Sequence, residues 1–382
     1  MKRIFSIKTV ILAGILLMNW QVLFPQDRKF SIQLDGIRLD SLYLIAWDHD
    51  FQKTIIKGNF SDDRYNFRIP DSTYFPARFY TLQPKLLDFK NKIAYALDLY
   101  SVQNNDTLYL SQFLIEDNQF FNAKYRGETV EDSVRVRYTM NNGRDTSFFA
   151  TTIDYQFTVY NEIDRENYLR SKLLSYSWFY DESKSYEEQL QEHRQLASEN
   201  PDSRFLISTI AGNVIRYKTK EDLQSVYELF TDSIKNSFFG LSIRKYLESP
   251  FENLYLIDGK NESEAPVIVN RSKPNLVIFS ASWCKPCMEE VPVLKKIHAD
   301  LQDKLEMVYV SMDDERTVAN WKVFMEKENI EWRSVLGYKD VKKVEKTYHL
   351  NGIPQCVLVY PDGKFENMDV RKKEDLEKLY LL

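Results

Sequence analysis

Residues 275–292 read NLVIFSASWCKPCMEEVP, and this stretch decides how the C-terminal part of the chain folds. The apolar run 275–280 predicts a buried strand. A helix is predicted from Cys284 to about Leu301, so the first cysteine of the Cys-x-x-Cys pair lies where this helix begins. Strands and helices then alternate to the end of the chain, which predicts an α/β domain with a central sheet over residues 251–382.

The predicted position of Cys284 gives its sulfur the character of a nucleophile. Unpaired backbone N–H groups at a helix N-terminus, together with the positive end of the helix dipole, stabilise a thiolate. Lys285 adds a cation, and Pro286 fits the first helical turn because its missing N–H costs nothing there. Cys287 follows one turn later, within reach of the first sulfur. We therefore expect Cys284 to attack a substrate disulfide and Cys287 to resolve the mixed disulfide.

The remaining cysteine, Cys356, lies in a short apolar run, and we expect a buried structural residue rather than a further redox cysteine. The chain has 3 cysteines, too few for a framework of structural disulfides. Half of a zinc site is the alternative for the Cys-x-x-Cys pair. Such a site needs about four ligands, and His298 and His349 show no paired spacing. We expect no metal and no other cofactor.

Residues 283–292 resemble the TlpA/ResA-like branch of the thioredoxin superfamily, whose motif reads Trp-Cys-x-Pro-Cys-x-x-Glu-x-Pro. Further matches to this branch are Trp321, Phe324, Ile330, the loop Gly352-Ile353-Pro354 and the turn Pro361-Asp362-Gly363-Lys364. The resemblance covers about residues 251–382 and implies a thioredoxin-like domain with a redox-active disulfide between Cys284 and Cys287. Lys-Pro between the cysteines resembles the reductants of this branch.

The resemblance also assigns a role to a carboxylate. Glu290 matches the family's acidic residue near the sulfurs, and a base there would take the proton from Cys287 as it attacks. The alternative is a surface glutamate on a charged helix. Ile278 occupies the strand position where thioredoxin carries a buried aspartate, which makes Glu290 more necessary.

Three residues are implied to bind the substrate. Pro354 is expected in cis, where it presents the backbone of Ile353 to a substrate strand. Trp283, which precedes the first cysteine, is the third.

The N-terminus carries an export pattern over residues 1–26. Lys2, Arg3 and Lys8 form a positive start, and the run 10–18 is apolar apart from one glycine. No cleavage site is evident, so an uncleaved N-terminal membrane anchor is the alternative to a signal peptide. We expect an exported protein of the periplasm or cell envelope.

Two further regions separate this segment from the α/β domain. Residues 27–160 alternate with period two and predict an antiparallel β domain, a sandwich, in which His49 is a lone filler. Its turn signals are Ser61-Asp62-Asp63, Asn104-Asn105-Asp106 and Asn142-Gly143. Residues 161–250 predict a small helical region that acts as a spacer, with a capping box from Thr219 to Asp222.

The whole sequence thus predicts an exported thiol–disulfide oxidoreductase of the protein disulfide reductase type. Its partners would be protein thiols and disulfides and an unidentified electron donor. A net charge of −5 without a basic patch argues against nucleic-acid binding. One alternative is an envelope adaptor whose β domain docks a partner or ligand, with the α/β domain as an accessory. Another is a thiol peroxidase, which the paired cysteines argue against. The motif does not fix the direction of electron flow, because this depends on the reduction potential.

Overall fold

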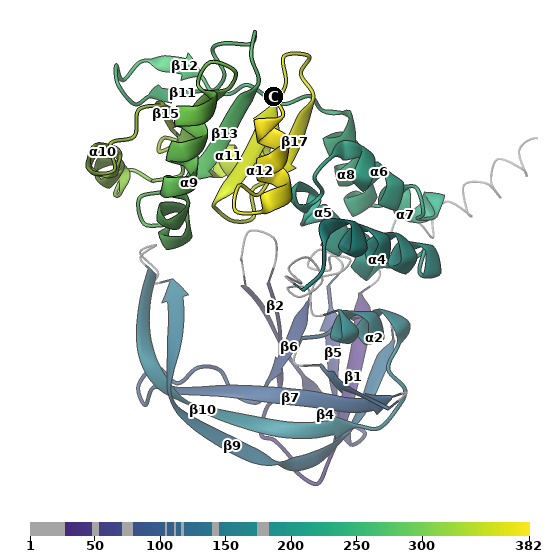
Figure 1. Ribbon diagram of the computed structural model, residues 1–382. Coiled ribbons are helices and arrows are strands. Elements are labelled where there is room, and N and C mark those ends of the chain that lie inside the picture. The colour runs from purple at the N-terminus through teal and green to yellow at the C-terminus, as the bar shows by residue number, and fades with distance from the viewer. Residues whose placement is uncertain are drawn as a thin grey trace, which may run out of the picture. The chain divides into compact units, whose positions relative to one another are not determined.

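The computed structural model describes residues 27–47, 53–70, 79–103, 105–110, 112–115, 118–139, 145–173 and 183–382. The chain divides into two compact units, Met1–Ser177 and Trp178–Leu382. Figure 1 colours the first from purple to blue-green and the second from teal to yellow. The predicted export segment 1–26 and His49 lie outside the described residues. Within the described ranges, no helix is long and apolar enough to cross a membrane.

The first unit is built on one sheet. Its strands are β1 (Arg28–Asp35), β2 (Tyr43–Trp47), β3 (Lys53–Lys57), β4 (Asn59–Ser61), β5 (Arg64–Ile69), β6 (Tyr80–Gln83), β7 (Ile93–Gln103), β8 (Asp106–Tyr109), β9 (Gln119–Thr139) and β10 (Asp145–Val159). They pair in the order β3-β2-β6-β7-β10-β9-β1-β5-β4, with β8 on β7. One helix follows, α2 (Arg165–Lys172), which Asp164 caps.

The predicted β-rich domain is confirmed, but its strands do not all pair antiparallel as expected. The described strands form a single 10-stranded sheet. Two pairings, β1 with β9 and β7 with β10, are parallel, and the others are antiparallel. The long strands β9 and β10 stay paired through register shifts and carry the sheet on without a break. Buried residues from both halves of the sheet, such as Phe30 and Phe157, pack into one core.

The predicted turns agree with the strand pairing. Asp62 and Asp63 both have positive φ, 53° and 61°, which is the backbone that a two-residue hairpin between β4 and β5 requires. Strands β7 and β8 pair directly on either side of residues 104–105. Strands β9 and β10 pair up to Thr139 and Asp145, while Asn142 and Gly143 lie outside the described residues.

The second unit begins with a helical segment. Its elements are α4 (Tyr186–Glu199), α5 (Arg204–Ala211), η3 (Val214–Arg216), α6 (Lys220–Tyr227), α7 (Asp232–Lys235) and α8 (Phe238–Glu248). The predicted capping box is present, since the Thr219 hydroxyl accepts from the N–H of Asp222 while the Asp222 carboxylate accepts from the N–H of Thr219. Ser203 caps α5 by a hydrogen bond of its side chain, since its hydroxyl accepts from the N–H of Leu206.

The α/β domain follows in the same unit. Its elements are β11 (Tyr255–Asp258), β12 (Glu264–Pro266), β13 (Asn275–Ser280), α9 (Lys285–Leu301), β14 (Glu306–Ser311), α10 (Val318–Lys327), β15 (Arg333–Leu336), α11 (Val341–Thr347), β16 (Gln355–Val359), β17 (Phe365–Met368) and α12 (Lys373–Tyr380). The sheet order is β12-β11-β15-β14-β13-β16-β17. The central strands β13, β14 and β15 are parallel, and β16 and β17 are antiparallel to their neighbours. Every residue of β13 is buried, as its apolar sequence predicts.

The helical segment packs against this sheet, so it is more than the predicted spacer. Asn367 in the edge strand β17 donates its backbone N–H to the carbonyl of Lys218, at 2.8 Å. The Asn367 side chain donates to the carbonyl of Tyr217, at 2.9 Å. Periodicity identifies a helix but not the surface that its apolar face covers, which is why the sequence did not predict this contact.

Candidate active site

The paired cysteines lie at the junction between a buried strand and a helix. Strand β13 ends at Ser280, and Cys284 is the N-cap residue of α9. The sulfurs of Cys284 and Cys287 form a disulfide with an S–S distance of 2.06 Å. The backbone N–H of Cys287 also points to the Cys284 sulfur, at 3.3 Å. This places Cys284 where an unpaired helix N–H stabilises negative charge on sulfur.

A buried aspartate holds the loop before Cys284. Asp313 follows strand β14 and is fully buried. Its carboxylate accepts from the backbone N–H of Ser282 at 2.9 Å, from the Ser282 hydroxyl at 2.5 Å and from the Ser311 hydroxyl at 3.0 Å. These contacts fix the backbone that delivers Cys284 to the helix. Asp313 is not among the site residues expected from the sequence, although an acidic residue soon after an apolar strand in an α/β sheet is a signal that could have identified it.

The loop before β16 brings its backbone to the sulfurs. The Ile353–Pro354 peptide bond is cis, as expected. The carbonyl oxygen of Ile353 lies 3.7 Å from the Cys284 sulfur. Beside the pair, Trp283 is 60% exposed and Met288 is 41% exposed, so an apolar surface borders the disulfide.

Glu290 is buried, which excludes the alternative of a surface glutamate. Its exposed fraction is 3%, and it lies on α9 three residues after Cys287, on the same side of the helix. Its Oε1 atom lies 3.2 Å from Nε of Arg371. Its Oε2 atom is buried and has no hydrogen-bond partner among the described residues. Burial raises the pKa of Glu290 to about 7, against an opposing effect of Arg371.

Glu290 faces the side of the sheet on which Ile278 lies. Ile278 is in register with Tyr309 on one side and with Cys356 on the other. All three belong to the buried cluster that packs against α9. Glu290 interacts electrostatically with both Tyr309 and Cys356. A carboxylate thus reaches the same face of the sheet from the helix instead of from the strand.

Cys356 is buried and outside the disulfide, in agreement with the structural role expected for it. Burial first, and then the negative charge of Glu290, raise the pKa of the Cys356 thiol well above its ordinary value. Because the thiolate is the nucleophilic form, this thiol is held in its unreactive state.

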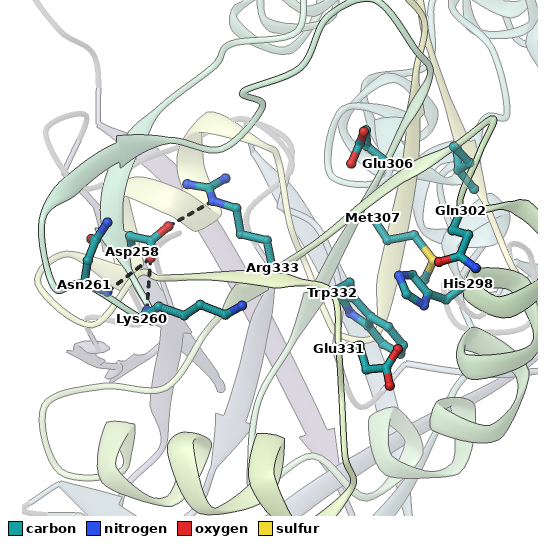
Figure 2. A pocket seen from close by; sticks show the side chains of 11 residues that line it. Asp258, Lys260, Asn261, His298, Gln302, Glu306, Met307, Glu331, Trp332 and Arg333 are labelled. Atoms are coloured by element: carbon teal, nitrogen blue, oxygen red, sulfur yellow. Dashed lines mark hydrogen bonds and ion pairs between the residues drawn. The ribbon is translucent and has the colours of Figure 1, made fainter.

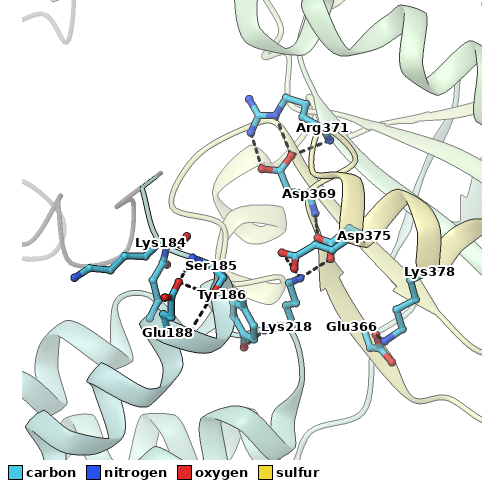
Figure 3. A network of polar contacts seen from close by, with 12 residues as sticks. Lys184, Ser185, Tyr186, Glu188, Lys218, Glu366, Asp369, Arg371, Asp375 and Lys378 are labelled. Carbon is cyan, nitrogen blue, oxygen red and sulfur yellow. Dashed lines mark hydrogen bonds and ion pairs between the residues drawn. The ribbon is translucent and has the colours of Figure 1, made fainter.

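Arg371 belongs to a polar network that reaches the helical segment (Figure 3). Arg371 donates to the Asp369 carboxylate, and the backbone N–H of Asp369 donates to Asp375 at 2.8 Å. Asp375 in turn forms an ion pair of 2.6 Å with Lys218. Glu290 and these four residues line a cavity of about 170 Å³, which is large enough for water.

A larger pocket lies at the other end of α9 (Figure 2). It measures about 470 Å³, and His298, Gln302, Trp332 and Arg333 are among its lining residues. Helix α9 has 17 residues and is therefore about 25 Å long, so this pocket is far from Cys284. No cysteine lines it. Pocket size alone would therefore point away from the cysteine pair.

Comparisons with known proteins agree with this geometry. The sequence profile of a thioredoxin-like family matches residues 272–365. The chain is 25% identical over 145 residues to the thioredoxin-like protein YneN of Bacillus subtilis, which covers 37% of this chain and 82% of YneN. It is 30% identical over 101 residues to the chloroplastic M-type thioredoxin of Chlamydomonas reinhardtii, 26% of this chain and 67% of that protein.

Other matches are shorter or concern solved structures. The chain is 36% identical over 59 residues to thioredoxin Y1 of Arabidopsis thaliana and spans 34% of that protein's length. The thioredoxin domain of a thiol-disulfide oxidoreductase from Bacteroides vulgatus is 28% identical, with a TM-score of 0.31, over 35% of this chain and 94% of that one. StoA from Bacillus subtilis is 20% identical, with a TM-score of 0.28, over 34% of this chain and 97% of StoA.

Proposed function

Because this chain belongs, through its C-terminal domain, to the thioredoxin-like family, we propose that it is a thiol–disulfide oxidoreductase acting through Cys284 and Cys287. The observation that carries the proposal is the joined pair of sulfurs at the N-terminus of α9, with the carbonyl of Ile353 beside it. Each sulfur is bonded to the other rather than to a cysteine elsewhere in the chain, so the pair is suited to disulfide exchange.

The first step begins from the reduced protein. The Cys284 thiolate attacks one sulfur of a substrate disulfide, so a bond forms between Cys284 and that sulfur while the substrate S–S bond breaks. The other substrate sulfur leaves as a thiolate and takes a proton from solvent. The helix N-terminus favours this step because it stabilises the attacking thiolate at Cys284.

The second step needs a proton acceptor. Cys287 transfers its proton to the Glu290 carboxylate and attacks the Cys284 sulfur, which breaks the mixed disulfide and releases the second substrate thiolate. Two electrons have then passed from the protein to the substrate, and the Cys284–Cys287 disulfide of this structure remains. A pKa of about 7 suits Glu290 to this task, because the group both accepts and returns a proton near neutral pH.

The substrates proposed are proteins. Exposed Trp283 and half-buried Pro354 border the sulfurs, and an extended protein segment can lie on such an apolar edge while its disulfide approaches Cys284. We propose net reduction of these disulfides, with an electron donor that restores the dithiol. The same steps run in reverse if the reduction potential is high.

Export to the periplasm or cell envelope is proposed from residues 1–26. Fractionation of the cells that make the protein, followed by mass spectrometry of its N-terminus, tests this. A shortened chain in the soluble envelope fraction supports a cleaved signal, and a full chain in the membrane fraction supports an anchor. A full chain in the cytosol contradicts export.

Turnover of insulin disulfides by the full chain with dithiothreitol tests the activity. Wild type should catalyse the reduction, and Cys284→Ser should fall to the uncatalysed rate. Cys356→Ser is the matched control, since that cysteine is buried outside the disulfide, and it should stay active. A wild type without activity would favour the adaptor alternative, in which the β-rich unit docks a partner and the cysteines are dispensable.

A further inference from the structure

Arg371 reaches the buried Glu290 from the surface of the α/β domain. Arg371 lies in the turn between β17 and α12, and its side chain is 53% exposed, whereas that of Glu290 is 4% exposed. Its Nε atom is 3.2 Å from Oε1 of Glu290. One positive charge from the surface is therefore in contact with one negative charge in the interior.

Asp369 fixes the orientation of this guanidinium group. The Asp369 carboxylate accepts from Nε of Arg371 at 2.9 Å, from Nη2 at 3.2 Å and from the Arg371 backbone N–H at 3.1 Å. Asp369 is itself held through its backbone N–H by Asp375, which pairs with Lys218 of the helical segment. Figure 3 shows this chain of contacts. The bidentate geometry is specific to arginine, because a lysine ammonium cannot form the two parallel hydrogen bonds.

The other groups around Glu290 do not replace this cation. The titratable or charged residues that face Glu290 or line its cavity are Tyr309, Cys356, Asp369, Asp375, Lys218, Arg216, Tyr186 and Lys372. Burial raises the pKa of Tyr309 and of Cys356, so both stay neutral. The negative charge of Asp369 raises the pKa of Glu290, and Asp375 is paired with Lys218. Among the residues that the structure describes, Arg371 forms the ion pair with the Glu290 carboxylate, while Arg216 and Lys372 belong to the lining of the cavity.

We infer that Arg371, clamped by Asp369, is a positioning residue that keeps Glu290 ionised near neutral pH so that it accepts the Cys287 proton. The inference rests on the proposed function, in which Glu290 is the proton acceptor. Its physical basis is that burial disfavours a carboxylate, whereas a cation within about 4 Å favours it and shifts a carboxyl pKa by roughly 1–3 units.

Single-turnover reaction of the reduced full chain with 5,5′-dithiobis(2-nitrobenzoic acid) tests the inference. This disulfide releases one coloured thiolate when Cys284 attacks and a second when Cys287 resolves the mixed disulfide. In Arg371→Gln, the midpoint of the pH profile of the second phase should rise by about one unit. The second phase should slow about fivefold at pH 7 and approach the wild-type rate at pH 9, since one unit of pKa changes the ionised fraction by about that factor. The first phase should not change.

Three variants make this result specific. Arg371→Lys keeps the charge and should move the midpoint less than Arg371→Gln. Arg316→Gln is the matched control, because Arg316 forms the same Asp-x-Arg contact with Asp314, at 2.9 Å, on the protein surface. It should leave both phases unchanged. Adding Arg371→Gln to Glu290→Gln should have no further effect on the second phase.

Two results would overturn the inference. One is a profile of Arg371→Gln that superposes on that of wild type. The other is an equal loss at every pH, which would indicate a structural defect only. A wild-type protein that releases no second thiolate would contradict the proposed function itself. That result differs from both of the results above, so the two failures are distinguishable.

Discussion

The two ends of helix α9 show that the chemistry of a site does not follow the size of its pocket. The C-terminal end borders the 470 Å³ pocket, whose lining includes His298 and Trp332. The N-terminal end carries the Cys284–Cys287 disulfide and the buried Glu290 beside a much smaller cavity. Only the N-terminal end of a helix offers free N–H groups to a thiolate, so the backbone itself distinguishes the two ends.

Of the substitutions at the two ends of α9, those of the cysteines should change the rate of disulfide exchange most. Cys284→Ser should abolish disulfide exchange, because the attacking sulfur is lost. Cys287→Ser should still attack but cannot resolve, so it should accumulate mixed disulfides with substrate proteins. Non-reducing gels of envelope extracts check this, and the adducts should vanish in the double variant. Adducts that persist there would place the reactive thiol at Cys356.

A smaller effect is expected one turn further along α9. Glu290→Gln should slow the resolving step on the order of 10²-fold, the low end for a positioned proton-transfer group. The release of the second thiolate in stopped-flow experiments measures this step. The wild-type rate should rise through pH 7, and the variant should lose this dependence, because its amide does not titrate. A variant with the wild-type rate and profile would mean that the proton goes elsewhere.

The same substitution should show how much the buried Glu290 carboxylate lowers the free energy of unfolding. Its pKa in the folded protein, about 7, lies above the ordinary value of 4.5, so the folded state binds more protons than the unfolded state between these two pH values. Stability should therefore fall as pH rises from about 4.5 to about 7. Glu290→Gln should remove this loss. Its free energy of unfolding should exceed that of wild type by about 3 kcal/mol at pH 8, and the two should be equal at pH 4. Urea unfolding at the two pH values checks the prediction, and an equal effect at both would contradict it.

The smallest effect should come from the other end of the helix. His298 packs on Trp332, with 5.4 Å between the ring centroids, and lies near the end of α9 that is opposite to Cys284. His298→Asn should therefore change the exchange rate by less than about twofold, since distant sites act independently. Insulin reduction assays compare it directly with Glu290→Gln. A loss similar to that of Glu290→Gln would show that the large pocket takes part in the reaction.

Local patterns predicted the parts of the site that lie close together in sequence. The strand over 275–280 and the helix after Cys284 follow from an apolar run and a proline at the first helical turn. The cis peptide before Pro354 was expected from its resemblance to a known loop. These features depend on neighbours a few residues away, which a sequence displays directly.

Other parts of the site depend on contacts between segments far apart in the chain. Arg371 is an ordinary charged residue in a turn, and nothing near it in sequence indicates that it approaches α9. The helical segment was predicted as a spacer, yet Lys218 reaches the α/β domain through Asp375. In the first unit, alternation predicted strands but not their partners, so the two parallel pairings were not predicted.

A redox titration of the full chain in glutathione buffers tests the central claim most directly, with the thiols of each sample alkylated and located by mass spectrometry. We expect one two-electron transition in which Cys284 and Cys287 change together, while Cys356 stays reduced throughout. A transition that involves Cys356, or a Cys284–Cys287 disulfide that no glutathione buffer and no dithiothreitol reduces in the folded protein, would contradict it.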